Sequence, residues 1–167
     1  MRDSTTPLQS IPEGVTDRIA AYANGLFAAD LAELAAHYGD KVRIYGIDVL
    51  GDLPHVASIA DVETLDMTAD DLRTWIPERL NAGPKDGHGD PTWLARPYCN
   101  LSTWPAVRGV VRALPDQYKR QVRYWIANPT GVRHIVPGSS ATQFFWGSPS
   151  SPGTNYDLSD VGGSWDQ

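Results

Sequence analysis

The stretch IAAYANGLFAADLAELAAHYGDKVRIYGI, residues 19–47, holds two short apolar runs separated by an amphipathic segment. The runs at 19–23 and 42–47 have the length and composition of buried strands. Asp30 is expected to cap a helix that ends before Gly39. Between these two residues, apolar side chains recur at the spacing of one helix face, namely Leu31, Leu34, Ala35 and Tyr38. The stretch therefore predicts a strand, a helix and a second strand.

The same alternation continues along the rest of the chain. Further strands are expected at 56–62, 94–99, 122–127, 141–146 and 156–158, and helices are expected after Asp71, from Ser102 or Thr103 to Leu114, and as a short turn at 116–121. Pro77 should kink or shorten the first of these helices. No helix fits between the strands at 42–47 and 56–62, which is atypical of a strict strand–helix repeat.

Strands that alternate with helices predict an α/β fold with a mainly parallel sheet. Right-handed crossovers wind such a sheet into a barrel or into an open, doubly wound form. A full eight-stranded barrel usually needs ~200 residues or more, and this chain has 167. We therefore expect a compact or incomplete (β/α) TIM-like barrel, with an open sheet as the alternative. The barrel is expected to cover residues 19–161, preceded by an extension at 1–18 and followed by a loosely ordered tail at 162–167, with loops at 81–91 and 148–153.

Composition excludes several classes of protein. The formal net charge of −6 and the lack of a dense basic patch argue against a nucleic-acid partner. No apolar stretch is long enough to span a membrane, and the first residues lack the pattern of a secretory signal. The single cysteine, Cys99, precludes an internal disulfide. No two histidines have metal-ligand spacing, so neither a metal nor another cofactor is expected.

Polar side chains recur where the predicted strands end, which in a parallel α/β protein is the functional end of the sheet. The candidate site residues are Asn24, Asp48, Asp61, Glu63, Tyr98, Asn100, Asn128, Gln143 and Asp157. Trp125 lies among several aromatic residues that suit either sugar stacking or the core. Such a ring of polar groups indicates a site, although a strand end is often polar merely because it is solvated.

The pair Asp61 and Glu63 is the sharpest local feature. Side chains two residues apart on a strand share a face, which places these carboxyls ~7 Å apart along the chain. Like charges at close range raise the pKa of at least one member of the pair, which yields a proton donor at neutral pH. Two carboxyls are also the minimal machinery for glycoside hydrolysis. A solvated acidic strand end explains the spacing equally well.

Five segments, in order, resemble those of family 25 glycoside hydrolases. Residues 60–63, Ala-Asp-Val-Glu, resemble the Asp-x-Glu strand of the family, and residues 97–100, Pro-Tyr-Cys-Asn, resemble the strand that follows it. Residues 124–127, Tyr-Trp-Ile-Ala, resemble its Leu-Trp-Ile-Ala strand. Residues 141–144, Ala-Thr-Gln-Phe, and 156–159, Tyr-Asp-Leu-Ser, are similar to its last two segments. The compact form resembles a divergent branch found in actinobacteria and their phages.

The resemblance implies a lysozyme-like muramidase, which cleaves the glycosidic bond after N-acetylmuramic acid in peptidoglycan. Glu63 is then the general acid, and Asp61 positions the substrate or stabilises an oxazolinium or oxocarbenium species. Asp157 is a further carboxylate of the site, and Tyr98 and Gln143 line the groove. The family opens with a strand that ends in an aspartate of the site, whereas the first predicted strand here ends in Ala-Asn24-Gly.

An amide at Asn24 can form hydrogen bonds but cannot act as a base. This departure leaves a second hypothesis open, a catalytically inactive structural or wall-binding module such as a phage virion component. The expected partner is the glycan strand of peptidoglycan, with a virion or homo-oligomeric assembly as a further expectation. We expect a protein made in the cytoplasm that acts at the cell wall after lysis or as part of a phage particle.

Overall fold

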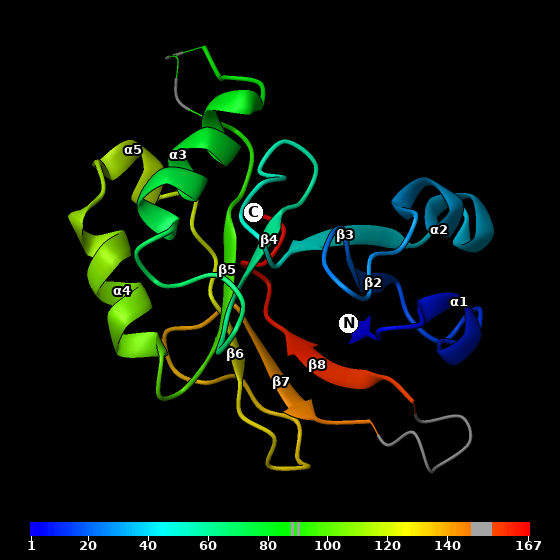
Figure 1. Ribbon diagram of the computed structural model, residues 1–167. Helices are drawn as coiled ribbons and strands as arrows, with labels where there is room; N and C mark the ends of the chain where they lie inside the picture. Colours follow the sequence, from blue (N-terminus) through cyan, green and yellow to red (C-terminus); the bar gives the residue numbers. More distant parts are fainter. Residues whose placement is uncertain (88, 90, 148–154) are drawn as a thin grey trace.

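A computed structural model describes residues 1–87, 89, 91–147 and 155–167. Within them, eight strands form a closed barrel in the order in which they occur along the chain (Figure 1). Their bounds are β1 Arg2–Asp3, β2 Arg18–Tyr22, β3 Arg43–Asp48, β4 Ile59–Val62, β5 Arg96–Asn100, β6 Trp125–Ala127, β7 Ala141–Phe145 and β8 Asp157–Val161. The predicted α/β barrel is confirmed, and it is closed rather than incomplete. The loop expected at 148–153 lies outside the described residues.

The sheet is parallel except at its last strand. Successive strands from β1 to β7 pair in parallel, as the sequence predicts. Strand β8 pairs antiparallel with β7 on one side and with β1 on the other, which closes the ring. Because β8 runs against its neighbours, its first residue, Asp157, lies at the same end of the barrel as the last residues of the parallel strands.

The helices cover the barrel unevenly. Their bounds are α1 Pro7–Ser10, α2 Leu31–Tyr38, α3 Leu72–Ala82, α4 Trp104–Ala113 and α5 Asp116–Lys119. Figure 1 shows α3, α4 and α5 grouped on one side of the barrel and α1 and α2 on the other. As expected, no described residue between β3 and β4 forms a helix. Among the described residues, no helix is both long and apolar enough to cross a membrane.

Local signals set most helix ends as predicted. Asp30 caps α2, because its side chain accepts hydrogen bonds from the backbone N–H groups of Ala32 and Glu33. Gly39 ends this helix with a φ of 71°, in the left-handed region that favours glycine. Helix α3 continues past Pro77 to Ala82, so the proline does not shorten it and the following loop begins later than expected.

The N-terminal segment belongs to the barrel, which corrects the expected extension at 1–18. Strand β1 pairs with β2 and β8, and Asp3 is buried at its end. The hydroxyl of Tyr38 on α2 donates hydrogen bonds to the carbonyls of Pro7 and Ile11, which holds α1 against α2. A strand of two residues has no measurable hydrophobic period, so sequence patterning could not detect it.

The last residues close the other end of the barrel, which corrects the expected loose tail at 162–167. Trp165 is 0% exposed and packs edge-on against Trp125, at 6.2 Å between ring centroids. The guanidinium of Arg96 lies over the Trp165 ring and donates a hydrogen bond to its carbonyl. Asp166 forms ion pairs with Arg18 and other arginines at the barrel base. The buried indole gives the tail the stability of a core element.

Candidate functional site

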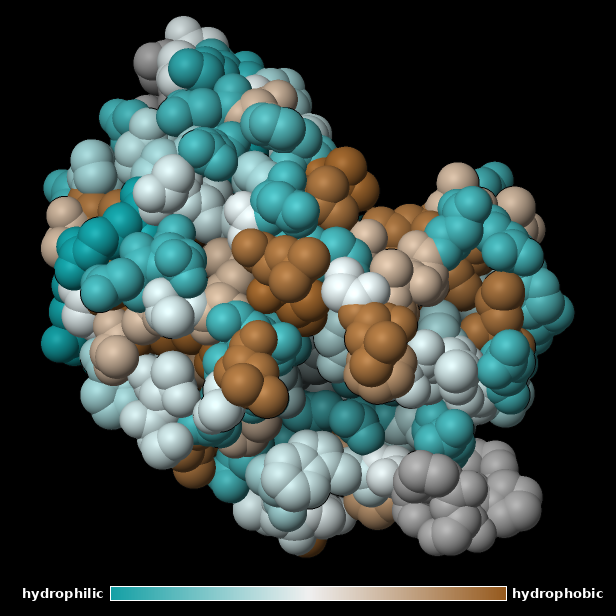
Figure 2. All heavy atoms as spheres, in the orientation of Figure 1, coloured by the Kyte–Doolittle hydropathy of each residue, from teal (hydrophilic) through white to brown (hydrophobic). Residues whose placement is uncertain are grey.

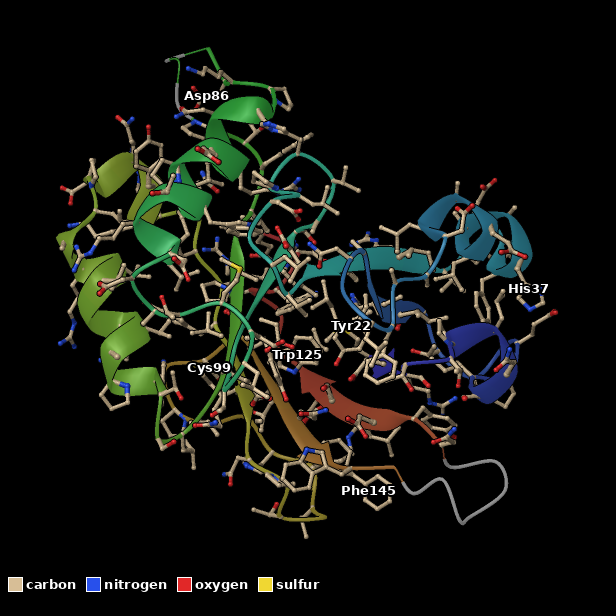
Figure 3. The ribbon with its side chains drawn as sticks, in the orientation of Figure 1. Tyr22, His37, Asp86, Cys99, Trp125 and Phe145 are labelled. Atoms are coloured by element: carbon tan, nitrogen blue, oxygen red, sulfur yellow. The ribbon has the colours of Figure 1, made fainter. Side chains whose placement is uncertain are left out.

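A cavity of about 190 Å³ opens where the parallel strands end. Its lining residues come from all eight strands and from the segments that follow β4 and β7: Asp3, Tyr22, Ile47, Asp61, Glu63, Tyr98, Trp125, Gln143, Trp146 and Asp157. Figure 2 shows a hollow on this face with hydrophilic side chains at its floor and hydrophobic side chains around it. Figure 3 shows that Tyr22 and Trp125 lie near the centre of the barrel end. Of the predicted residues, Asp61, Glu63, Tyr98, Trp125, Gln143 and Asp157 meet here.

Asp61 forms part of the cavity floor. It lies on β4 beside Tyr98 of β5, and its side chain is buried. One carboxyl oxygen, Oδ1, has no hydrogen-bond partner among the described residues. Burial, followed by the charges of Glu63, Asp66 and Asp3, raises the pKa of Asp61 to about 8. The carboxyl is therefore largely protonated at neutral pH and can donate a hydrogen bond.

Glu63 lies directly after β4, nearer to solvent than Asp61. Its side chain is half-buried and lines the same cavity. Burial and the charge of Asp66 raise the pKa of Glu63, whereas a hydrogen bond with Asn100 acts in the opposite direction. The raised pKa and the open access to the cavity are what a general acid requires.

Gln143 connects the opposite side of the cavity into one hydrogen-bonded network. The Tyr98 hydroxyl donates to Gln143 Oε1 at 2.5 Å. The Gln143 Nε2 then donates to Asp157 Oδ2 at 2.5 Å and to Asp3 Oδ2 at 3.5 Å. Because the tyrosine must donate to the amide oxygen, the amide NH₂ group faces the two carboxyls. Tyr98 therefore sets the orientation in which Gln143 holds Asp3 and Asp157.

Asp3 and Asp157 form a second carboxyl pair in the cavity. Burial, followed by the charge of Asp157, raises the pKa of Asp3 well above its usual range. Burial also raises the pKa of Asp157, although the N–H of Gly147 donates to its Oδ1 at 2.7 Å and counters the shift. Two buried carboxyls that repel one another favour a state in which at least one is protonated.

The sequence reasoning missed three residues of the cavity lining, Asp3, Tyr22 and Ile47, of which Asp3 is the one carboxyl. Asp3 ends β1, the first strand of the barrel, whereas the sequence reasoning took β2 as the first strand. The one available signal was an aspartate beside the short run at the N-terminus, which is too short to predict a strand.

Asn24 and Asp48 lie outside the cavity lining, so the structure does not bring them together with the other predicted site residues. Asn24 donates from Nδ2 to Asp48 Oδ1 at 2.7 Å and accepts from the Val49 N–H at 2.8 Å. Asp48 is 0% exposed and accepts four further hydrogen bonds, from the backbone of Leu50, Gly51 and Leu53 and from the indole of Trp75. Together they hold the tight β3–β4 connection that replaces a helix.

Asn100 and Asn128 also serve loops and do not line the cavity. The Oδ1 of Asn100 accepts hydrogen bonds from the backbone N–H groups of Ser102 and Thr103, the two residues directly before α4. Its remaining link to the site is the hydrogen bond with Glu63. Asn128 bonds to the His134 ring at 3.0 Å within the β6–β7 loop. A polar residue at a strand end can face the cavity or fix the next turn, and these two fix turns.

The aromatic residues of the site differ in exposure. Trp125 is 1% exposed, stacks against Tyr98 at 4.6 Å and donates from Nε1 to the Ser159 hydroxyl. It is therefore a buried wall of the cavity. Trp146, which follows β7, is 59% exposed and lines the cavity as well, so its ring is the accessible stacking surface. The described residues contain no group of three or more His, Cys, Asp or Glu side chains placed to hold a metal ion.

Comparison with known proteins gives similarity in structure only. No protein-family model and no curated protein sequence matches the chain. A muramidase from Acremonium alcalophilum has a TM-score of 0.46 at 13% identity, with 91% of each chain covered. A bacterial lysozyme from Streptomyces coelicolor has a TM-score of 0.49 at 13% identity, covering 89% of this chain and 81% of that one. An uncharacterized protein from B. stearothermophilus has a TM-score of 0.60 at 13% identity, covering 96% and 94%, which shows a shared fold.

Proposed function

We propose that this chain is a muramidase-like glycoside hydrolase that cleaves the glycan strands of peptidoglycan. The observation that carries the proposal is the convergence of Asp61, Glu63 and Asp157 in one open cavity. The catalytic hypothesis requires this convergence, since side chains on separate faces of the barrel could not act on one bond. None of the described residues of the 81–91 loop lines or blocks the cavity. Strands of peptidoglycan are the proposed partner.

Glu63 is the general acid in this proposal. It donates its proton to the glycosidic oxygen as the bond to C1 breaks, and the alcohol of the leaving sugar departs neutral. The resulting Glu63 carboxylate then takes a proton from the water that attacks C1, which restores the acid. The raised pKa of Glu63 supports this cycle, because at any given pH it leaves more of the carboxyl protonated than in an ordinary glutamate.

Asp61 enters the reaction as a hydrogen-bond donor. Burial keeps it largely protonated, and its unpartnered oxygen lies within the site. A neutral carboxyl of this kind positions the 2-acetamido group of the sugar beside C1. The carbonyl oxygen of this neutral carboxyl accepts a hydrogen bond from the acetamido N–H, and its dipole stabilises the positive charge that develops on an oxazolinium or oxocarbenium species, while the proton stays on Asp61. Asp3, Asp157 and Gln143 form the opposite wall that holds the sugar ring.

The inactive-module hypothesis loses its main support in this geometry. It rested on an amide at the end of the first predicted strand and on the missing helix before the strand at 56–62. Asp3 provides a carboxyl at the end of β1, whereas the described residues between β3 and β4 form no helix. Delivery to the wall after lysis or on a phage particle, and assembly into an oligomer, stay predictions.

The test is release of reducing sugar from purified actinobacterial peptidoglycan by the wild type and by Glu63→Gln. We expect activity in the wild type and a loss of ~100-fold or more in the variant, since general acid catalysis contributes that much. Glu78→Gln is the matched control, because Glu78 is an exposed glutamate on α3 outside the cavity. If the folded wild-type protein releases no sugar from several wall types, the catalytic proposal fails.

A further inference from the structure

The candidate site is one part of a longer groove. A neighbouring cavity of about 160 Å³ shares Asp3, Tyr22 and Asp157 with the first. A third, of about 260 Å³, shares Thr5 with the second and runs along α1 and the start of α2. The shared residues place the three cavities in a row. A groove of this extent receives several units of a linear polymer rather than one sugar.

Apart from tyrosines, the described residues that line this groove contain ionisable groups of one kind only, namely carboxyls. The six are Asp3, Asp30, Glu33, Asp61, Glu63 and Asp157. No described lysine, arginine or histidine lines any of the three cavities. The chain has 14 lysines and arginines and four histidines, so their exclusion from the lining is a property of the groove. A negatively charged ligand would find no counter-ion within this lining, although the Arg2 guanidinium lies behind it, 4.7 Å from the centroid of the Tyr156 ring.

The loops at the groove mouth present apolar side chains instead of basic ones. Segments 23–30 and 63–71, which follow β2 and β4, contain no lysine, arginine or histidine. Leu26 is 91% exposed and Leu65 is 97% exposed on these loops. Leu65 also has a φ of 78°, a left-handed conformation that costs a β-carbon residue free energy. Exposed apolar residues on each loop favour contact with uncharged parts of a ligand.

Two buried oxygens at the floor indicate the complementary chemistry. Asp3 and Asp61 are 6% and 4% exposed, and Oδ1 of each has no partner among the described residues. Such an oxygen is satisfied by a neutral N–H or O–H donor from the ligand. The amide N–H and hydroxyl groups of N-acetylated sugars are donors of this kind. A ligand carboxylate would be repelled by those of the groove carboxyls that are ionised, and Asp61, which is largely protonated, contributes little to this repulsion.

We propose that the groove selects strands whose muramic lactyl groups are capped as amides, and that it discriminates against strands with free lactyl carboxylates. This inference rests on the proposed function. In intact peptidoglycan, the stem peptide joins the lactyl group through a neutral amide. Removal of the stem by an amidase leaves a carboxylate beside the sugar ring, which brings a negative charge into a groove where the described ionisable groups, tyrosines apart, are all carboxyls.

The test compares three sets of soluble glycan strands of equal length. The first set carries stem peptides, the second has been stripped by an amidase, and the third has been stripped and then capped with methylamine as a neutral amide. We expect kcat/KM for the stripped strands to be ~10-fold lower than for the stem-bearing strands. Capping should restore it to within ~3-fold, because the cap removes the charge without restoring the peptide.

A substitution in the groove provides a second readout. Glu33→Gln removes one groove charge and should raise kcat/KM for the stripped strands relative to that for the capped strands ~2- to 3-fold. Glu78→Gln makes the same change outside the groove and should alter neither. If the two substitutions had equal effects, the selectivity would come from the net charge of the whole protein rather than from the groove, and the proposal would be overturned.

The outcomes separate this proposal from the proposed function. If stripped strands are cleaved as fast as stem-bearing strands, the selectivity is wrong while the glycosidase activity stands. If capping fails to restore cleavage, the groove recognises the stem peptide rather than the absence of the lactyl charge, and the proposal is again overturned. If none of the three sets is cleaved, the proposed function itself fails.

Discussion

Replacement of Asp48 by alanine should destabilise the fold strongly, although Asp48 lies outside the cavity. Its carboxylate is 0% exposed and accepts five hydrogen bonds, from Asn24, Leu50, Gly51, Leu53 and Trp75. A hydrogen bond to a charged group contributes ~1.5–3 kcal/mol. The five contributions are not additive, because the backbone donors of the loop can partly turn to water once the carboxylate is gone.

We therefore expect Asp48→Ala to lower the free energy of unfolding by ~3–5 kcal/mol, as does the loss of one partner from a buried charged network. Asp48→Asn keeps the shape but turns an NH₂ group toward donors, and it should cost ~2–3 kcal/mol. Urea denaturation followed by tryptophan fluorescence measures both values. Asp40→Ala is the control, because Asp40 is exposed and should change stability by less than ~0.5 kcal/mol.

A loss below ~1 kcal/mol for Asp48→Ala would refute the reasoning that Asp48 holds the β3–β4 connection. If activity fell while stability did not, Asp48 would instead belong among the substrate-binding residues, as the sequence first indicated.

Three further predictions address the site and the barrel base. The folded protein retains a proton on Asp61 that the unfolded chain releases, because the pKa rises from the ordinary value of 3.8 to about 8. The free energy of unfolding therefore falls as the pH increases through this range. Asp61→Asn mimics the protonated acid and should raise Tm more at pH ~8 than at pH ~5. An equal rise in Tm at both pH values would contradict the raised pKa of Asp61. Tyr98→Phe frees the Gln143 amide to rotate and should lower kcat ~10- to 100-fold. Because Gln143 is 2% exposed and loses a hydrogen-bond partner, the free energy of unfolding should also fall by ~1–3 kcal/mol, whereas wild-type kcat would show that the tyrosine does not set this orientation. Trp165→Ala should cost ~3–5 kcal/mol of stability in urea denaturation, and a loss below ~1 kcal/mol would mean that the tail is not part of the core.

The barrel was predictable wherever an element was long enough to show a period. The stripe from Leu31 to Tyr38 and the apolar run before Asp48 both gave elements close to those observed. Strand β1 has two residues and Trp165 is a lone aromatic between polar neighbours, so neither carries a pattern. Their places are set by pairing and packing with residues far away in the chain, which no local window contains.

The site was predictable only in part, because a polar residue at a strand end has two uses. Asp61 and Gln143 face the cavity, whereas Asn24 and Asn100 fix the loops that follow their strands. The choice depends on the conformation of the next few residues and on which donors they bring near. That conformation is a property of the folded loop, and spacing in the sequence does not reveal it.

The antiparallel closing strand ties the completion of the site to the order of synthesis. Asp3 and Asp157 pair across β1 and β8, and 154 positions separate them in the chain. Contacts of such long range form late, because closing so large a loop costs entropy before any contact repays it. Strand β1 has no partner on its outer side until residues 157–161 have been synthesised. The carboxyl pair therefore cannot assemble before β8 has been synthesised, and the end of the barrel that holds the candidate site forms only after translation has passed β8.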